Sequence, residues 1–226
     1  LRRKKRSGTT FFMILLAALQ LLISRITGTT DILIGAPVAG RNHAAFEPLI
    51  GCFLNNLVLR TIIRESSTFT QLLGQVREKV LGAILHQDVP FEKLLEVVPH
   101  ARHAGRTPLF QVLLNMHDFS DKDLSLPGMH TRFVPSPTVK SLFDWTLYFQ
   151  EHPDGIHLKL VYNAGLFSQP RMKEILNQLI GLLEQVADDP DLPLHRYSLI
   201  THVSKKYLPD PTILLETPQQ ETVPTL

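Results

Sequence analysis

The chain has 226 residues, of which 44% are apolar, so it is long enough to bury a core and is not disordered as a whole. Its 23 basic and 21 acidic residues give a formal charge of +2, and much of the excess lies at residues 2–6, which excludes a general nucleic-acid-binding surface. The single cysteine, Cys52, excludes an internal disulfide and indicates a reducing compartment, so we expect a cytoplasmic protein.

The first expected element is a helix over residues 10–26, which Thr27-Gly28 should end. Because it follows basic residues, its apolar start imitates a signal peptide or membrane anchor. The uninterrupted apolar run is shorter than the ~20 residues that a membrane span needs, and Gln20, Ser24 and Arg25 interrupt its continuation. We therefore expect a buried core helix and no membrane partner.

Two strands and two helices are expected next. Residues 31–38 form a short apolar run that is typical of a central strand buried on both faces, and 55–63 predict a second strand after a loop. Thr68 and Gln71 form a capping box before a helix with one apolar stripe, which should end near His86-Gln87. Pro90 favours the start of a short helix over 91–98.

The second half of the chain predicts a strand over 110–117, an irregular segment over 120–137, and a hairpin with strands at 144–151 and 156–163. Ser168 should cap a last helix that ends at 188–191. The expected fold of residues 1–203 is one α/β domain: a two-layer sandwich with a mixed, largely antiparallel sheet and helices packed on one face. The proline-containing stretch 204–226 is expected to be a linker toward a following domain.

Polar clusters with catalytic or metal-binding spacing are weak. His100-x-x-His103 has no nearby cysteine or carboxylate to complete a metal site, so we expect a solvated loop and no metal. Cys52 stands at the head of an apolar strand and is expected to be a small core residue rather than a nucleophile. No glycine-rich loop that could cradle a phosphate is present in the sequence.

Three motifs carry a family resemblance. They are Ile50-Gly51-Cys52-Phe53-Leu54-Asn55-Asn56-Leu57-Val58-Leu59-Arg60, His86-Gln87-Asp88-Val89-Pro90-Phe91-Glu92, and Arg106-Thr107-Pro108-Leu109-Phe110. In this order and spacing the chain resembles the C-terminal lobe of a condensation domain from a nonribosomal peptide synthetase. The resemblance implies one lobe of the chloramphenicol-acetyltransferase type.

A complete domain of that family carries His-His-x-x-x-Asp-Gly in its other lobe, and these 226 residues contain no such motif. Residues 116–122 keep the spacing, but methionine replaces the first histidine and lysine replaces the glycine. We expect that segment to be non-functional, because a loop glycine allows conformations that lysine resists.

The resemblance implies a function in peptide-bond formation between aminoacyl or peptidyl thioesters tethered to carrier proteins. The implied partners are an N-terminal condensation lobe, peptidyl carrier protein domains with their phosphopantetheine arms, and a following synthetase domain, expected to be an adenylation domain. No cofactor is expected to bind this chain directly. Since the catalytic histidine lies in the other lobe, we expect this chain to be a fragment that is inactive alone and leaves an apolar face exposed.

The motif residues are candidates for lining the substrate tunnel between the two lobes, and each also has an architectural interpretation. The candidates are Asn55, Asn56, Arg60, His86, Gln87, Asp88 and Arg106. An arginine that ends a strand often pairs with a nearby acid, and side chains at a helix end can satisfy free backbone groups.

Two alternative functions remain open at this stage. One is a noncatalytic docking or scaffold lobe that only binds carrier proteins. The other is a lobe of a coenzyme A-dependent acyltransferase, which would not explain the proline-containing tail or the three motifs.

Overall fold

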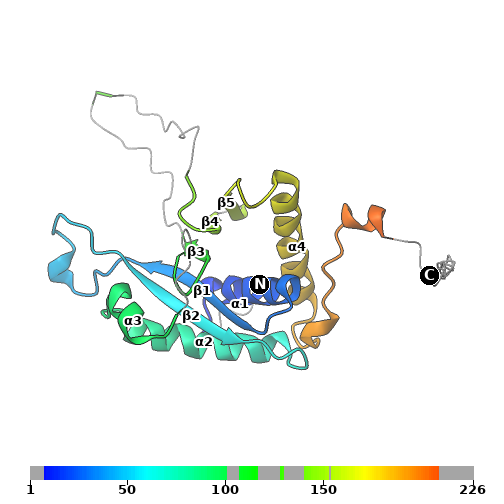
Figure 1. The fold of residues 1–226 in the computed structure, drawn as a ribbon, viewed down its shortest axis with the longest axis horizontal. Coiled ribbons are helices and arrows are strands. Elements are labelled where there is room, and N and C mark those ends of the chain that lie inside the picture. Colours follow the sequence, from blue (N-terminus) through cyan, green and yellow to red (C-terminus); the bar gives the residue numbers. More distant parts are fainter. Residues whose placement is uncertain (1–7, 101–106, 117–127, 130–139, 153, 209–226) are drawn as a thin grey trace, which may run out of the picture.

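The computed structural model describes residues 8–100, 107–116, 128–129, 140–152 and 154–208. Within them, a five-stranded mixed sheet in the order β2-β1-β3-β4-β5 carries long helices on one side (Figure 1). The strands are β1 (Asp31–Val38), β2 (Asn55–Ile62), β3 (Val112–Met116), β4 (Trp145–His152) and β5 (Gly155–Tyr162). The helices are α1 (Phe11–Thr27), α2 (Phe69–Leu85), α3 (Phe91–Val97) and α4 (Gln169–Asp188).

The sheet confirms the expected mixed topology. The β1–β2 and β4–β5 pairs are antiparallel ladders of eight residue pairs each, whereas β3 runs parallel to both β1 and β4, with one and five pairs. Most of the paired residues are therefore antiparallel. The two-layer α/β fold expected from the sequence is confirmed.

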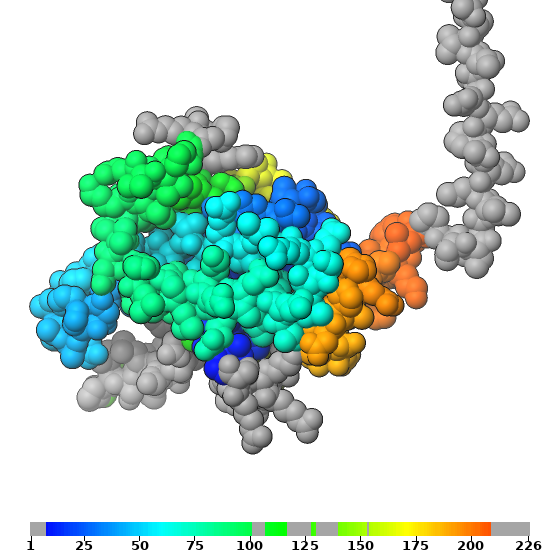
Figure 2. All heavy atoms as spheres, turned by 90° about the horizontal axis from the view of Figure 1, so that it is seen from below, coloured from blue at the N-terminus to red at the C-terminus, as the bar shows by residue number. Residues whose placement is uncertain are grey.

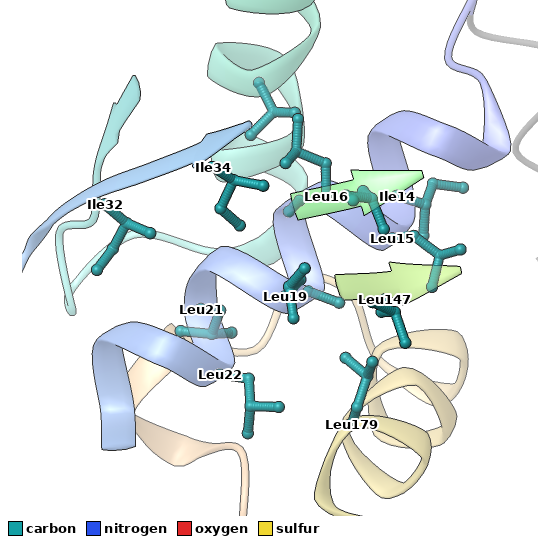
Figure 3. Packing of buried hydrophobic residues seen from close by; sticks show 14 of the residues in the cluster. Ile14, Leu15, Leu16, Leu19, Leu21, Leu22, Ile32, Ile34, Leu147 and Leu179 are labelled. Carbon is teal, nitrogen blue, oxygen red and sulfur yellow. The ribbon is translucent and has the colours of Figure 1, made fainter. Parts of the chain in front are cut away.

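Helix α1 lies at the centre of the core. Eleven of its 17 residues are buried, and its side chains pack against β1 and β4 on one side and α4 on the other (Figure 3). Gln20, which interrupts the apolar pattern, is buried too, and its side-chain N–H donates to the carbonyl oxygen of Leu59 at 3.1 Å. This bond satisfies the donor side of a buried amide and ties α1 to β2. The expected core helix is confirmed, and none of the described helices is both long and apolar enough to cross a membrane.

Helices α2 and α4 flank α1 and present their apolar stripes to it. Figure 2 views the molecule with α2 across the front, the loop of residues 41–54 at one end and the orange C-terminal segment at the other. The α2 capping box forms as expected, because Thr68 accepts from the Gln71 N–H while Gln71 accepts from the Thr68 N–H. Ser168 occupies the N-cap position of α4, but its side chain makes no capping bond.

The second face of the sheet is closed over its middle by Phe110. The expected strand over 110–117 starts only at Val112, because Leu109 has a positive φ of 68° and the Phe110 N–H donates to the Pro108 carbonyl oxygen. This turn places the Phe110 ring directly over Gly35, where a Cβ atom would collide with it. Phe91 and Phe143 pack against the same ring at centroid distances of 5.6 and 5.3 Å. Strand β1 is therefore covered on both faces at Gly35.

A row of five residues crosses this second face, one from each strand. Gly35 pairs with Val58 and Leu113, Leu113 pairs with Thr146, and Thr146 pairs with Val161. Their neighbours in sequence point to the opposite face, toward the helices, where Ile34, Leu59, Leu114 and Leu147 are all buried. The alternation fixes the strand register, since a slip by one residue would exchange the two faces.

The segment after α4 contains two short 3-10 turns and is attached to α1 and α4 by side-chain hydrogen bonds. Residues Leu194–Arg196 form η3 and Ser204–Tyr207 form η4. Arg25 of α1 donates to the carbonyl oxygens of Leu194 and Tyr197 at 3.0 and 3.3 Å, and Thr201 donates to Glu174 of α4 at 2.5 Å. Of the stretch expected to be a linker, the structure describes residues 204–208.

Candidate functional site

Asn55 joins two of the sequence motifs. It is the first residue of β2, and its side-chain amide donates to the carbonyl oxygens of Gln87 and Val89 at 2.9 and 2.7 Å. Its Oδ1 accepts from the N–H groups of Phe91 at 3.0 Å and Asn56 at 2.9 Å. These four bonds use both donors and both lone pairs of the amide. Asn55 thus fixes the turn between α2 and α3 against the start of β2 and keeps no free polar atom for a ligand.

Asp88 extends the same connection to a third segment. Its carboxylate accepts from the side-chain amide of Asn42 at 2.6 Å, and Asn42 lies in the loop that follows β1. The loop after β1, the start of β2 and the turn before α3 therefore meet at one end of the sheet. We call the set Asn42, Asn55, Gln87, Asp88 and Val89 the motif junction.

Arg41 organises the loop that leads into the motif junction. Its guanidinium donates to the backbone carbonyl oxygens of Phe46, Glu47 and Gly51, the last two at 3.3 and 3.2 Å. It also lies over the Phe53 ring at 4.4 Å, and Phe46 stacks on that ring with a centroid distance of 6.0 Å. Gly40, with φ at +64°, is required beside it because a Cβ atom would meet the Phe53 carbonyl oxygen.

The loop around Arg41 presents apolar side chains to solvent. Leu49, Ile50 and Leu54 are 48%, 104% and 70% exposed, and the loop projects beyond the end of the sheet (Figure 1). Val89, in the motif junction, is exposed as well. Large apolar groups gathered on a projecting loop are typical of a surface that contacts another protein part.

The expectation for Cys52 is wrong. The residue is exposed, because β2 starts at Asn55 and the preceding residues belong to the loop held by Arg41 rather than to a buried strand. The strand itself begins at Asn55, as expected, and only the burial predicted for Cys52 is wrong. The apolar residues just before the strand form the exposed surface of the loop.

Arg60 lies apart from the motif junction. It is five residues further along β2, about 17 Å from Asn55 at the usual rise of a strand. Its guanidinium donates two bonds to the carboxylate of Asp31, at 2.9 and 2.7 Å, and both side chains are exposed. The hydrogen bonds and charge of Arg60 lower the pKa of the Asp31 carboxyl below its ordinary value, although slight desolvation acts in the opposite direction. The architectural interpretation of Arg60, an arginine paired with a nearby acid, describes this geometry.

The other candidates fall into three groups. His86 caps α2 through its backbone N–H and its side chain is exposed, while Gln87 enters the motif junction through its carbonyl oxygen. Asn56 is half-buried and pairs with Pro37 of β1. Arg106 and the segment 117–122 lie outside the described residues. Sequence reasoning did not single out Arg41 and Asn42 as site residues, although both lie in the loop that follows β1.

The residues of the motif junction hold the three segments together and do not form a catalytic group. Its polar groups are amides, backbone carbonyls and one carboxylate, and they bond to each other. None of them is a histidine, cysteine or serine positioned to act as a base or nucleophile. The imidazoles that adjoin it in sequence, those of His43 and His86, are both exposed.

The mixed sheet with its helices on one face is the α/β lobe that the sequence resemblance implied. A family model described as "Condensation domain" matches residues 2–208, and the chain belongs to this family. Two curated relatives are bacitracin synthase 1 of Bacillus licheniformis, 39% identical over 197 residues, and surfactin synthase subunit 1 of Bacillus subtilis (strain 168), 37% identical over 205 residues. These matches cover 87% and 88% of this chain but only 4% and 6% of the relatives, so the chain spans a small part of their length.

Solved structures agree with the fold. The X-domain from teicoplanin biosynthesis superimposes with a TM-score of 0.80 and is 28% identical, over 88% of this chain and 46% of that chain. A four-domain nonribosomal peptide synthetase bound to AMP and glycine gives a TM-score of 0.76 at 21% identity, over 89% of this chain and 16% of that one. The first condensation domain of the CDA synthetase gives 0.69 at 18% identity, over 88% and 44%. This chain corresponds to less than half of each neighbour.

Proposed function

We propose that this chain forms the C-terminal half of a condensation cleft, in which an amide bond is made between thioesters carried on two carrier proteins. The observation that carries the proposal is the motif junction, in which two of the three family-like motifs meet the exposed apolar loop of residues 41–54. The chain would supply one wall of the cleft and part of the surface on which carriers dock.

In this proposal, the catalytic base lies in the other lobe of the cleft. An amine that attacks a thioester must lose a proton, and a histidine with a near-neutral pKa can accept or orient that proton. Within these 226 residues there is no His-His-x-x-x-Asp-Gly motif. The role of this chain is then to position the tethered reactants, which can contribute much of a bimolecular rate enhancement by itself.

The proposed partners follow from the same arrangement. An N-terminal condensation lobe would cover the exposed apolar side chains Leu49, Ile50 and Leu54, and carrier domains would bring phosphopantetheine arms into the cleft. A following adenylation domain is the proposed neighbour beyond residue 203. The multidomain size of the curated relatives supports this environment.

The test is reconstitution. The 226-residue chain is mixed with loaded donor and acceptor carriers, with and without a separately produced lobe that carries His-His-x-x-x-Asp-Gly, and amide product is measured by mass spectrometry. We expect product only with both lobes, and none when the second histidine of the added lobe is replaced by alanine. Product formed by the chain alone, above the uncatalysed rate, would contradict the proposal.

One observation favours a second candidate function, a docking lobe without condensation chemistry. The X-domain that this chain resembles at 28% identity has also been solved in a complex with OxyB. A docking lobe would bind carriers or another protein with and without the second lobe, and reconstitution would give binding but no amide product.

A further inference from the structure

The tip of the β4–β5 hairpin brings together two histidines and one aspartate. His152 ends β4 and pairs with Gly155, the first residue of β5. His157 is two residues further along β5, so both imidazoles project from the same face of the hairpin. Asp154 lies in the turn between them. The three side chains are partly exposed, and β5 is an edge strand of the sheet.

The side chains of this triad converge. Asp154 Oδ1 lies 3.7 Å from His152 Nδ1, and Asp154 Oδ2 lies 3.2 Å from His157 Nε2. The two imidazole rings stack almost parallel, with centroids 4.6 Å apart and planes at 3°. One nitrogen from each ring and a carboxylate oxygen lie within 4.8 Å of one another.

This spacing suits a metal ion of the zinc class. Bonds of about 2.0–2.2 Å at tetrahedral angles separate neighbouring ligand atoms by about 3.3–3.6 Å. Each imidazole lies close to that distance from one oxygen of the Asp154 carboxylate, and a bound metal would bring both imidazoles to the same oxygen. The widest pair must close by about 1 Å, which rotation of exposed side chains at a hairpin tip can provide. Imidazole and carboxylate are ligands that zinc prefers, and three of them leave one position for water.

We propose that His152, Asp154 and His157 form a binding site for a divalent transition metal of the zinc class, which closes the tip of the β4–β5 hairpin. Neither the family resemblance nor the condensation chemistry calls for this metal, and the site is separate from the motif junction.

The site differs from the histidine pair noticed in the sequence. His100-x-x-His103 had no carboxylate to complete it, and the His100 ring lies 2.9 Å from the carbonyl oxygen of Val98. In the triad, by contrast, Asp154 completes the set, and strand pairing brings together histidines that are five positions apart in the sequence. The hairpin register, rather than the sequence spacing alone, places the two imidazole rings side by side.

The test is zinc binding by the 226-residue chain, freed of any affinity tag and stripped with a chelator. Zinc is titrated in competition with a chromogenic indicator, and backbone amide shifts are followed by NMR. We expect one zinc per chain, with the first shifts at residues 150–158. His157→Ala and Asp154→Asn should weaken binding at least about 10-fold, since losing a direct ligand costs no less than losing its supporting hydrogen bond.

Two matched variants control the result. His202→Ala removes an exposed histidine elsewhere, and His100→Ala removes one member of the other pair; both should bind zinc as the parent does. Binding weaker than about 1 mM, or binding that His157→Ala and Asp154→Asn leave unchanged, would overturn the proposal. Circular dichroism verifies that the variants are folded, and the isosteric Asp154→Asn keeps the test valid if an alanine variant is not.

Discussion

The side-chain amide of Asn55 donates to the carbonyl oxygen of Val89 at 2.7 Å, across 34 positions of sequence. The same side chain also donates to the Gln87 carbonyl oxygen and accepts from the Phe91 N–H, which fixes the turn before α3, and it accepts from the Asn56 N–H within β2. Asn55→Ala should therefore lower the free energy of unfolding by about 2 kcal/mol, because it leaves several backbone groups without their partners. Urea denaturation measures the change.

A matched control for Asn55 is Asn42→Ala. Asn42 makes one exposed bond to Asp88, so its loss should cost less than about 1 kcal/mol. Equal effects of the two substitutions would argue against Asn55 as the residue that fixes the junction.

Gly35 is required by the Phe110 ring above it. Gly35→Ala should destabilise the chain by about 1–3 kcal/mol, because the new methyl group collides with a buried ring. Gly74→Ala, in the middle of α2 with open space around it, should instead stabilise by about 0.5–1 kcal/mol. Denaturation midpoints of the two variants, which move in opposite directions from the parent, check the prediction.

Phe110→Leu provides the coupling test for that contact. In the Gly35→Ala background it should cost less than in the parent, because the smaller side chain relieves the collision. Additive losses in the double variant would contradict a direct contact between residues 35 and 110.

Tyr197 makes the stability depend on alkaline pH. Burial, with a smaller effect of the Asp189 and Asp191 carboxylates, raises its pKa from 10.0 to about 12, and its hydroxyl donates to the Asp189 carbonyl oxygen at 2.7 Å. Above pH 10 the unfolded chain releases this proton while the folded chain keeps it, so the contribution of Tyr197 is complete below pH 10 and is lost as the pH rises to about 12.

The Tyr197→Phe variant isolates the contribution of the Tyr197 hydroxyl to the free energy of unfolding. The stability difference between parent and variant should be constant from about pH 8 to 10 and should change in favour of the variant above pH 10. Lysine titration affects both chains alike and cancels. A difference that does not vary with pH would refute the assignment.

The Arg60–Asp31 pair predicts a titration effect. In Arg60→Met the pKa of the Asp31 carboxyl should rise toward its ordinary value, since its hydrogen-bond donor and neighbouring charge are lost. Carbon-13 NMR of the carboxyl follows it directly. Added salt should reduce the difference between the parent and the variant, and an unchanged Asp31 pKa would mean that the pair does not persist in solution.

Sequence patterns predicted the helices, the strand order along the chain and the hairpin, because apolar periodicity and capping residues act locally. They failed where a contact distant in sequence decides the structure. Cys52 was expected to be buried at the head of the second strand, yet it lies in an exposed loop that Arg41 holds through the Gly51 carbonyl oxygen. Phe110 was expected to belong to a strand, yet its ring packs over the sheet at Gly35, where the absence of a Cβ atom leaves room for it.

The site was predictable only in part for the same reason. The motifs gave Asn55, Gln87 and Asp88 as candidates, but their bonds to each other and to Asn42 depend on three segments meeting in space. Arg60 belongs to the same motif as Asn55, and the length of β2 separates them. A linear motif does not distinguish residues that meet from residues that only follow one another.

The central position of α1 has a consequence for synthesis of the chain on the ribosome. Its partner α4 begins at Gln169, roughly 140 residues after α1 ends at Thr27. At about 5–20 residues per second, the ribosome needs about 7–28 s to make that interval. During this time the apolar side chains of α1 that will meet Leu179 have no α4 to cover them. Nascent-chain chaperones thus have a defined interval in which to bind this helix.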